Sequence, residues 1–117
     1  MSVFPDIVRR LPEAGLSIDG LTIHISHSDT HEVWFLHSEA PVDYPPHAHS
    51  AQWGIVLTGE IEITMQGKRR CFAKGDSYYL PEGVEHSVKM SAGYAEIIFV
   101  NEPDFLGRTA AASRAID

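Results

Sequence analysis

Between Leu21 and Val100 the chain alternates short apolar segments with turn-forming residues, and no segment in this span has a helical stripe. This pattern is typical of an all-β sandwich or barrel. The segment GEIEITMQG is the clearest strand, because apolar and polar residues alternate along it and so place one side in a core and the other in water. We expect strands at residues 21–27, 32–38, 53–57, 61–66, 69–73, 77–80, 87–90 and 94–100.

Glycine marks the breaks between these strands, at positions where a positive φ angle is expected. The predicted turns are Thr58-Gly59, Gln66-Gly67, Lys74-Gly75-Asp76, Pro81-Glu82-Gly83 and Ala92-Gly93. The length of 117 residues fits one domain. We expect an N-terminal segment at 1–20, the barrel at 21–102 and a tail at 103–117, with helical character at Pro5–Leu11 and in the alanine-rich segment FLGRTAAASRAID.

Charge and composition exclude several classes of protein. Nine Lys and Arg against sixteen Asp and Glu give a net charge of −7, which repels nucleic acid and anionic membrane surfaces. No apolar run approaches the ~18 residues of a membrane span, and the N-terminal segment MSVFPDIVRRLPEAG does not have the pattern of a secretory signal. We therefore expect a soluble cytoplasmic protein with neither a nucleic acid nor a membrane as partner.

Cys71 is the only cysteine, so the chain has no internal disulfide and no thiolate metal cluster of its own. We expect Cys71 to fill space in a half-buried strand.

Two histidines stand one residue apart in the segment YPPHAHSAQWGIVLTGE. On an extended strand His47 and His49 point to the same side, ~6.6 Å apart along the chain, and two imidazoles can converge on one ion from there. The pair is weak evidence by itself, because a chain with seven histidines among 117 residues holds roughly 0.4 such pairs by chance.

A second motif is more specific. In KGDSYYLPEGVEHSVKM, Gly75, Pro81, Gly83 and His86 form the pattern G-x5-P-x-G-x2-H, which arises by chance at a frequency of roughly 2 × 10⁻³ in such a chain. The segment Pro81-Glu82-Gly83 predicts a tight corner that directs His86, at the start of the next strand, into the barrel.

The two motifs together resemble those of the cupin superfamily, G-x5-H-x-H-x3-4-E-x6-G and G-x5-P-x-G-x2-H-x3-N. The resemblance implies a cupin-type jelly-roll β-barrel, or double-stranded β-helix, that pairs as a homodimer and holds a metal inside. It places His47, His49 and His86 at the metal-binding positions.

The sequence also departs from that pattern. Pro41 replaces the opening glycine, Met90 replaces the closing asparagine, and Gln52 stands where the family usually has glutamate, with a shortened interval after His49. Gln52 is interpreted either as a fourth ligand or as a polar strand residue bonded to a neighbour. Three neutral imidazoles and an amide leave a divalent ion a stronger Lewis acid than a carboxylate would.

The sequence also predicts the environments of several other side chains. Glu96, in YAEIIFV, is either a buried base with a raised pKa or a residue of a wet face, and the pattern favours the wet face. Trp53 has the opposite parity to Gln52 and is expected to pack against another layer or a partner subunit. Tyr78 and Tyr79 are interpreted as ordinary strand residues, and the one that faces inward is placed to hydrogen-bond a ligand. The remaining histidines are expected to have surface or packing roles; they are His24, His27, His31 and His37.

The sequence predicts a metal-dependent enzyme that uses one divalent transition metal per chain, Zn, Ni, Fe, Mn or Cu, with Glu96 as a catalytic residue. Its substrate is expected to be a small carbonyl or hydroxyl compound, and sugar acids are included because the His/His/Gln/His pattern resembles that of the cupins that open unsaturated uronates. Those cupins also use an arginine near the end of the last strand, and residues 97–107 contain none. The alternatives are an iron-dependent dioxygenase and a non-catalytic ligand-binding or sensing module.

Overall fold

The structure is a computed structural model that describes residues 3–16 and 18–103. Within these residues a four-residue helix, α1 (Asp6–Arg9), precedes nine strands. The strands are β1 (Leu21–His27), β2 (Glu32–Ser38), β3 (Val42–His47), β4 (Gln52–Thr58), β5 (Glu60–Met65), β6 (Lys68–Ala73), β7 (Ser77–Leu80), β8 (His86–Met90) and β9 (Tyr94–Val100). The segment at 105–117, for which helical character is expected, lies outside the described residues. Among those that are described, no helix has the length and apolar character needed to cross a membrane.

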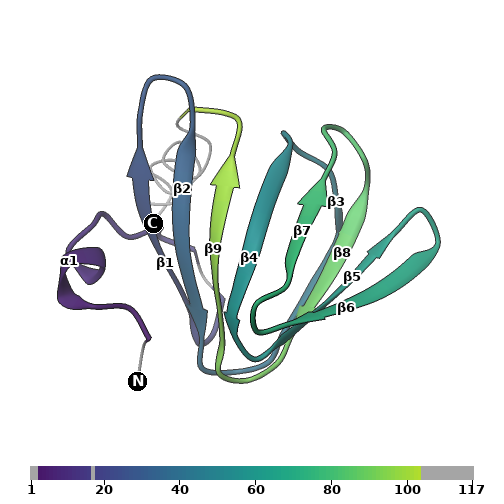
Figure 1. The fold of residues 1–117 in the computed structure, drawn as a ribbon, viewed down its shortest axis with the longest axis horizontal. Helices are drawn as coiled ribbons and strands as arrows, with labels where there is room; N and C mark the ends of the chain where they lie inside the picture. The colour runs from purple at the N-terminus through teal and green to yellow at the C-terminus, as the bar shows by residue number, and fades with distance from the viewer. Residues whose placement is uncertain (1–2, 17, 104–117) are drawn as a thin grey trace.

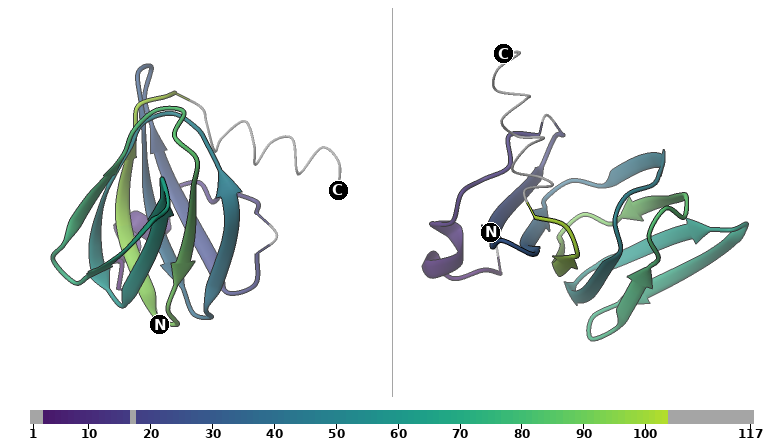
Figure 2. Two further views of the ribbon diagram at one scale, coloured as in Figure 1. Left: turned by 90° about the vertical axis from the view of Figure 1, so that its right-hand side faces the viewer. Right: turned by 90° about the horizontal axis from the view of Figure 1, so that it is seen from above.

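The strands form two antiparallel sheets (Figure 1). The five-stranded sheet has the order β1-β2-β9-β4-β7 and the four-stranded sheet the order β3-β8-β5-β6. Buried apolar side chains of both sheets belong to one cluster, so the sheets enclose a common interior (Figure 2). The predicted all-β jelly-roll class is confirmed.

The eight predicted strands are all present, each within one residue of its expected ends. The sequence pattern missed β3, because it contains Pro45 and Pro46, which cannot donate hydrogen bonds to a neighbouring strand. The structure accommodates both prolines because β3 lies at the edge of its sheet and its pairing with β8 is irregular between Tyr44 and His47. The turn prediction is confirmed, since the glycines of all five predicted turns have φ angles between 74° and 90°.

Alternation along the strands decides which side chains face the interior. In β5, Ile61 and Ile63 are buried as predicted, and Glu62 lies on the opposite face. Cys71 of β6 pairs with Glu62 and therefore lies on the outer face of an edge strand, where it is exposed. The expectation that Cys71 fills a half-buried position is wrong for this reason.

Gly54 leaves room for one aromatic ring on the inner face of the five-stranded sheet. It lies in β4 between Tyr78 of β7 and Ile98 of β9. A Cβ atom at position 54 would lie 2.5 Å from both Cζ and the hydroxyl oxygen of Tyr78. The Tyr78 ring therefore lies over the glycine and reaches towards β9.

We expect Gly54→Ala to destabilise the protein by about 1–3 kcal/mol, because the new methyl group displaces the Tyr78 ring from a packed interior. Urea unfolding of the wild type and of this variant measures the cost. The control is the same substitution in a Tyr78→Leu background, where the shorter side chain relieves the overlap and the cost of the alanine is expected to fall. An equal loss of unfolding free energy in both backgrounds would show that the position of the Tyr78 ring does not depend on the missing side chain of Gly54.

Candidate metal centre

The structure brings together the three histidines that the sequence motifs singled out. One ligand nitrogen of each of His47, His49 and His86 lies within 4.8 Å of the others. The ring centroids are 5.2 Å apart for His47 and His49, 4.3 Å for His47 and His86, and 4.9 Å for His49 and His86. Within residues 3–16 and 18–103, none of the other four histidines joins this histidine cluster.

Backbone pairing positions the cluster. His47 is the last residue of β3 and pairs directly with His86, the first residue of β8. The amide of Gly83, in the corner that precedes β8, donates a hydrogen bond to the carbonyl oxygen of His49 at 3.0 Å. The second motif is thereby bound to the first. The two early histidines do not share a strand as expected, because β3 ends at His47 and His49 follows in a loop.

Each ring of the histidine cluster has one nitrogen occupied by a backbone carbonyl. Nδ1 of His47 donates to the Pro45 oxygen at 2.9 Å, and Nδ1 of His49 donates to the Ser50 oxygen at 2.7 Å. Nδ1 of His86 donates to the Val84 oxygen at 3.0 Å. Because a carbonyl only accepts, these bonds fix the tautomer and leave Nε2 of every ring with a lone pair for a metal.

Burial favours the neutral form of two rings of the cluster. It lowers the pKa of His49 and of His86, whose side chain is 2% exposed, below the ordinary value of 6.5. The bonds to the carbonyls oppose this effect, and the neighbouring His47 adds to it by repulsion between like charges. Two of the three imidazoles are therefore unprotonated at neutral pH, which is the form that binds a cation.

The donor set fits one divalent transition metal. Nitrogens that share a tetrahedral ion at ~2.1 Å lie about 3.4 Å from one another. The ligand nitrogens lie within 4.8 Å of one another, so the rings have to turn closer together to reach that value. Three protein ligands also leave at least one coordination position open, as in catalytic rather than structural sites.

A buried hydrogen-bonded chain of Gln52, Tyr78 and Glu96 lies on the five-stranded sheet. The Tyr78 hydroxyl donates to Oε1 of Glu96 at 2.5 Å and accepts a hydrogen bond from Nε2 of Gln52 at 3.1 Å. The amide nitrogen of Gln52 is thereby engaged, so its carbonyl oxygen is the atom left to act as a ligand. This hydrogen bond matches the interpretation of Gln52 as a bonded polar strand residue, and its role as a fourth metal ligand stays a prediction.

Glu96 does not lie on a wet face, and the interpretation that favoured one is wrong. Its side chain is 1% exposed, because β9 lies between β2 and β4 and Glu96 shares the inward parity of Tyr94 and Ile98. Burial raises the pKa of Glu96 to about 7, against the opposing effect of the hydrogen bond from Tyr78. The carboxyl group therefore exchanges a proton near neutral pH.

The histidine cluster, Gln52, Tyr78 and Glu96 line one cavity of about 210 Å³. Two further residues lie close to the cluster and were missed by the sequence motifs. The ring of Tyr44 packs edge-on against His47 at 4.7 Å. Glu102 accepts a hydrogen bond from Ser50, and its negative charge opposes the lowering of the His49 pKa by burial. Tyr44 lies on β3, the strand that the sequence pattern missed because it contains two prolines. Glu102 follows β9 and belongs to no recognisable motif.

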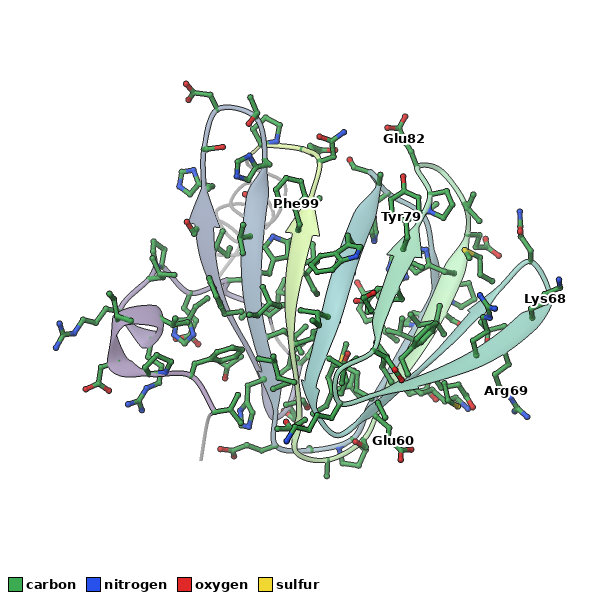
Figure 3. The ribbon with its side chains drawn as sticks, viewed as in Figure 1. Glu60, Lys68, Arg69, Tyr79, Glu82 and Phe99 are labelled. Carbon is green, nitrogen blue, oxygen red and sulfur yellow. The ribbon has the colours of Figure 1, made fainter. Side chains whose placement is uncertain are left out.

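The other face of the five-stranded sheet carries aromatic residues. Tyr79 points outward while Tyr78 points into the cavity, and Tyr79 and Phe99 both lie on the face turned towards the viewer in Figure 3. Trp53 lies between them in register and is 43% exposed. Trp53 does not pack against another layer of the described chain, and its contact with a partner subunit stays a prediction.

Comparisons with known proteins bear on the fold. The profile of the family described as "Cupin domain" matches residues 33–101. A comparison of the sequence with curated proteins gives no match. The chain is similar in structure to KdgF from Halomonas sp., with 21% identity, a TM-score of 0.67 and coverage of 76% of this chain and 86% of that one.

Two further structures are similar. An RmlC-like cupin from Shewanella frigidimarina shares 18% identity and has a TM-score of 0.72, covering 83% of this chain and 88% of that one. An oxalate decarboxylase variant from Bacillus subtilis shares 15% identity and has a TM-score of 0.72, covering 88% of this chain and 30% of that one. The profile match spans more than half of the chain and includes all residues of the histidine cluster. The chain therefore belongs to the cupin domain family.

Proposed function

We propose that the protein is a metal-dependent enzyme acting on a small carbonyl or hydroxyl compound. The histidine cluster holds one divalent transition metal, and the Gln52 carbonyl oxygen is its fourth protein ligand, so the substrate oxygen takes a fifth position as the ion expands its coordination. One observation carries the proposal: three imidazoles converge within 4.8 Å, each has Nδ1 bound to a carbonyl, and all three line one cavity.

The chain's own residues supply the rest of the chemistry. When bound, the metal is a Lewis acid that polarises a substrate oxygen. Glu96 accepts or releases a proton near neutral pH, because its pKa is about 7. Tyr78 is a positioning residue that fixes the carboxyl group of Glu96 and the amide of Gln52 at once. Apolar side chains form most of the cavity wall around these groups.

Nitrogen ligands accept Zn, Ni, Fe, Mn and Cu, and each of these ions fits the proposed site. The absence of a carboxylate among the proposed ligands weighs against the common facial triad of iron oxygenases. It therefore favours non-oxidative Lewis-acid chemistry over the alternative of an iron-dependent dioxygenase.

Two assays on one metal-loaded preparation test the proposal. We expect hydrolysis of 4-nitrophenyl acetate that disappears on chelation and returns with metal, and no dioxygen uptake with cysteine, acetylacetone or catechol. The control is His27→Ala, which removes an exposed histidine outside the cluster and is expected to leave the rate unchanged. Substrate-dependent oxygen uptake by the iron form would instead assign a dioxygenase, and bound metal with neither activity would assign a ligand-binding module.

A further inference from the structure

The cavity has two unlike parts. Its polar groups are the histidine cluster, Tyr44, Gln52, Tyr78 and Glu96, and the last three satisfy one another by hydrogen bonds. The rest of the wall is hydrocarbon. The apolar residues that line it are Leu16, Ile18, Leu21, Ile23, Trp34, Leu36, Val42, Ile61, Leu80, Val88, Met90 and Ile98.

The apolar wall begins directly beside the metal ligands. His86, Val88 and Met90 stand at alternate positions of β8 and all line the cavity. At ~3.4 Å per residue, Met90 lies ~14 Å along the strand from His86. Val42 pairs with Met90 across the sheet and extends the same surface, and Ile61 pairs with Met90 from the other side. When the polar head of a ligand binds at the histidine cluster, the rest of the ligand therefore has apolar side chains along one entire side.

Among residues 3–16 and 18–103, no lysine or arginine lines the cavity. Apart from the cluster, the titratable groups on its wall are Tyr44, Tyr78 and the acidic Glu96. A carboxylate away from the metal would find no cationic partner there. Each hydroxyl of a sugar acid would likewise lose water without gaining a hydrogen bond, which costs affinity.

We propose that the substrate is a small molecule with a single metal-chelating head and an apolar remainder of several carbons, and not a polyhydroxylated sugar acid. The inference rests on the proposed function, because the head is placed by the metal. The volume of about 210 Å³ lies below the ~300–1,000 Å³ of sites for drug-sized ligands, so the apolar remainder is short.

Two hydroxamic acids of equal length test this directly, since they share one chelating head. Hexanohydroxamic acid has an alkyl tail, whereas gluconohydroxamic acid has the same carbon count with a hydroxyl on each tail carbon. By calorimetry on the metal-loaded protein we expect the alkyl compound to bind more than about 30-fold tighter. From acetohydroxamic acid upward, affinity is expected to rise by about fourfold per methylene while the tail fits.

A pair of variants on one strand locates the tail. Met90→Gln places an amide in the apolar wall and is expected to reduce the affinity for hexanohydroxamic acid at least fivefold. Lys89→Gln is the matched control, because Lys89 is exposed on the opposite face of β8, and it is expected to leave that affinity unchanged.

Metal binding is titrated first, without hydroxamate, so that two failures stay distinct. If no metal binds, the proposed function fails and the substrate class fails with it. If metal binds but gluconohydroxamic acid binds as tightly as its alkyl counterpart or more tightly, the substrate class is wrong while the proposed function stands.

Discussion

Replacing His86 by alanine is expected to abolish stoichiometric metal binding. His86 lies at the centre of the candidate site, because it pairs with His47 in the sheet and its ring packs against both other imidazoles. Loss of an outer partner of a metal ligand typically costs 10–100-fold in affinity, so loss of a ligand is expected to cost more than about 100-fold. Elemental analysis of protein purified without added metal, followed by titration against a competing chelator, measures the loss.

Two companion variants separate ligation from folding. His47→Ala removes a half-buried ligand at the end of an edge strand and is expected to cause a similar loss of metal with little effect on the metal-free fold. His27→Ala, at an exposed position outside the cluster, is expected to retain full occupancy. Full metal content in both the His47 and the His86 variants would remove the site assignment.

Replacing Glu96 by glutamine is expected to remove a large pH dependence of stability. Burial raises the pKa of Glu96 from 4.5 to about 7. Between these values the folded chain holds a proton that the unfolded chain has released, so the free energy of unfolding falls as pH rises through this window. The stability linked to the protonated carboxyl is fully present below pH 4.5 and is lost once pH has risen through about 7. The loss is on the order of 3 kcal/mol.

Urea unfolding of metal-free wild type and Glu96→Gln, between about pH 5 and pH 8, tests this directly. The glutamine carbonyl still accepts a hydrogen bond from Tyr78, and the histidines are the same in both proteins, so their own titration cancels in the difference. Relative to the variant, wild type is expected to lose stability steadily towards alkaline pH. Glu60→Gln removes an exposed carboxylate of β5 and is expected to follow wild type. Parallel curves for wild type and Glu96→Gln would mean that the Glu96 carboxyl is not buried.

The histidine cluster could be predicted from sequence because its residues lie in motifs with fixed spacing. The Pro81-Glu82-Gly83 corner and the positive φ of its glycine are local properties of a few residues, and they direct His86 wherever the strands pair. The sequence pattern did not predict the strand that contains Pro45 and Pro46, for the opposite reason. Its place at the edge of a sheet, where proline is tolerated, is a property of the whole fold.

The surroundings of Glu96 depend on sheet order and register, which the sequence pattern does not contain. The carboxylate is buried because β9 takes a central position between β2 and β4. Tyr78 reaches it only because Gly54 stands opposite in the intervening strand. A single charged residue in a short apolar strand therefore suggested a wet face, whereas the tertiary arrangement made it part of the interior.

Anomalous diffraction from crystals of the metal-loaded protein tests the central claim most directly. One peak per chain is expected, within ~2.0–2.1 Å of Nε2 of His47, His49 and His86, with every Nδ1 still facing its carbonyl oxygen. A peak bound elsewhere, or three imidazoles that stay free of metal in a fully loaded crystal, would contradict it.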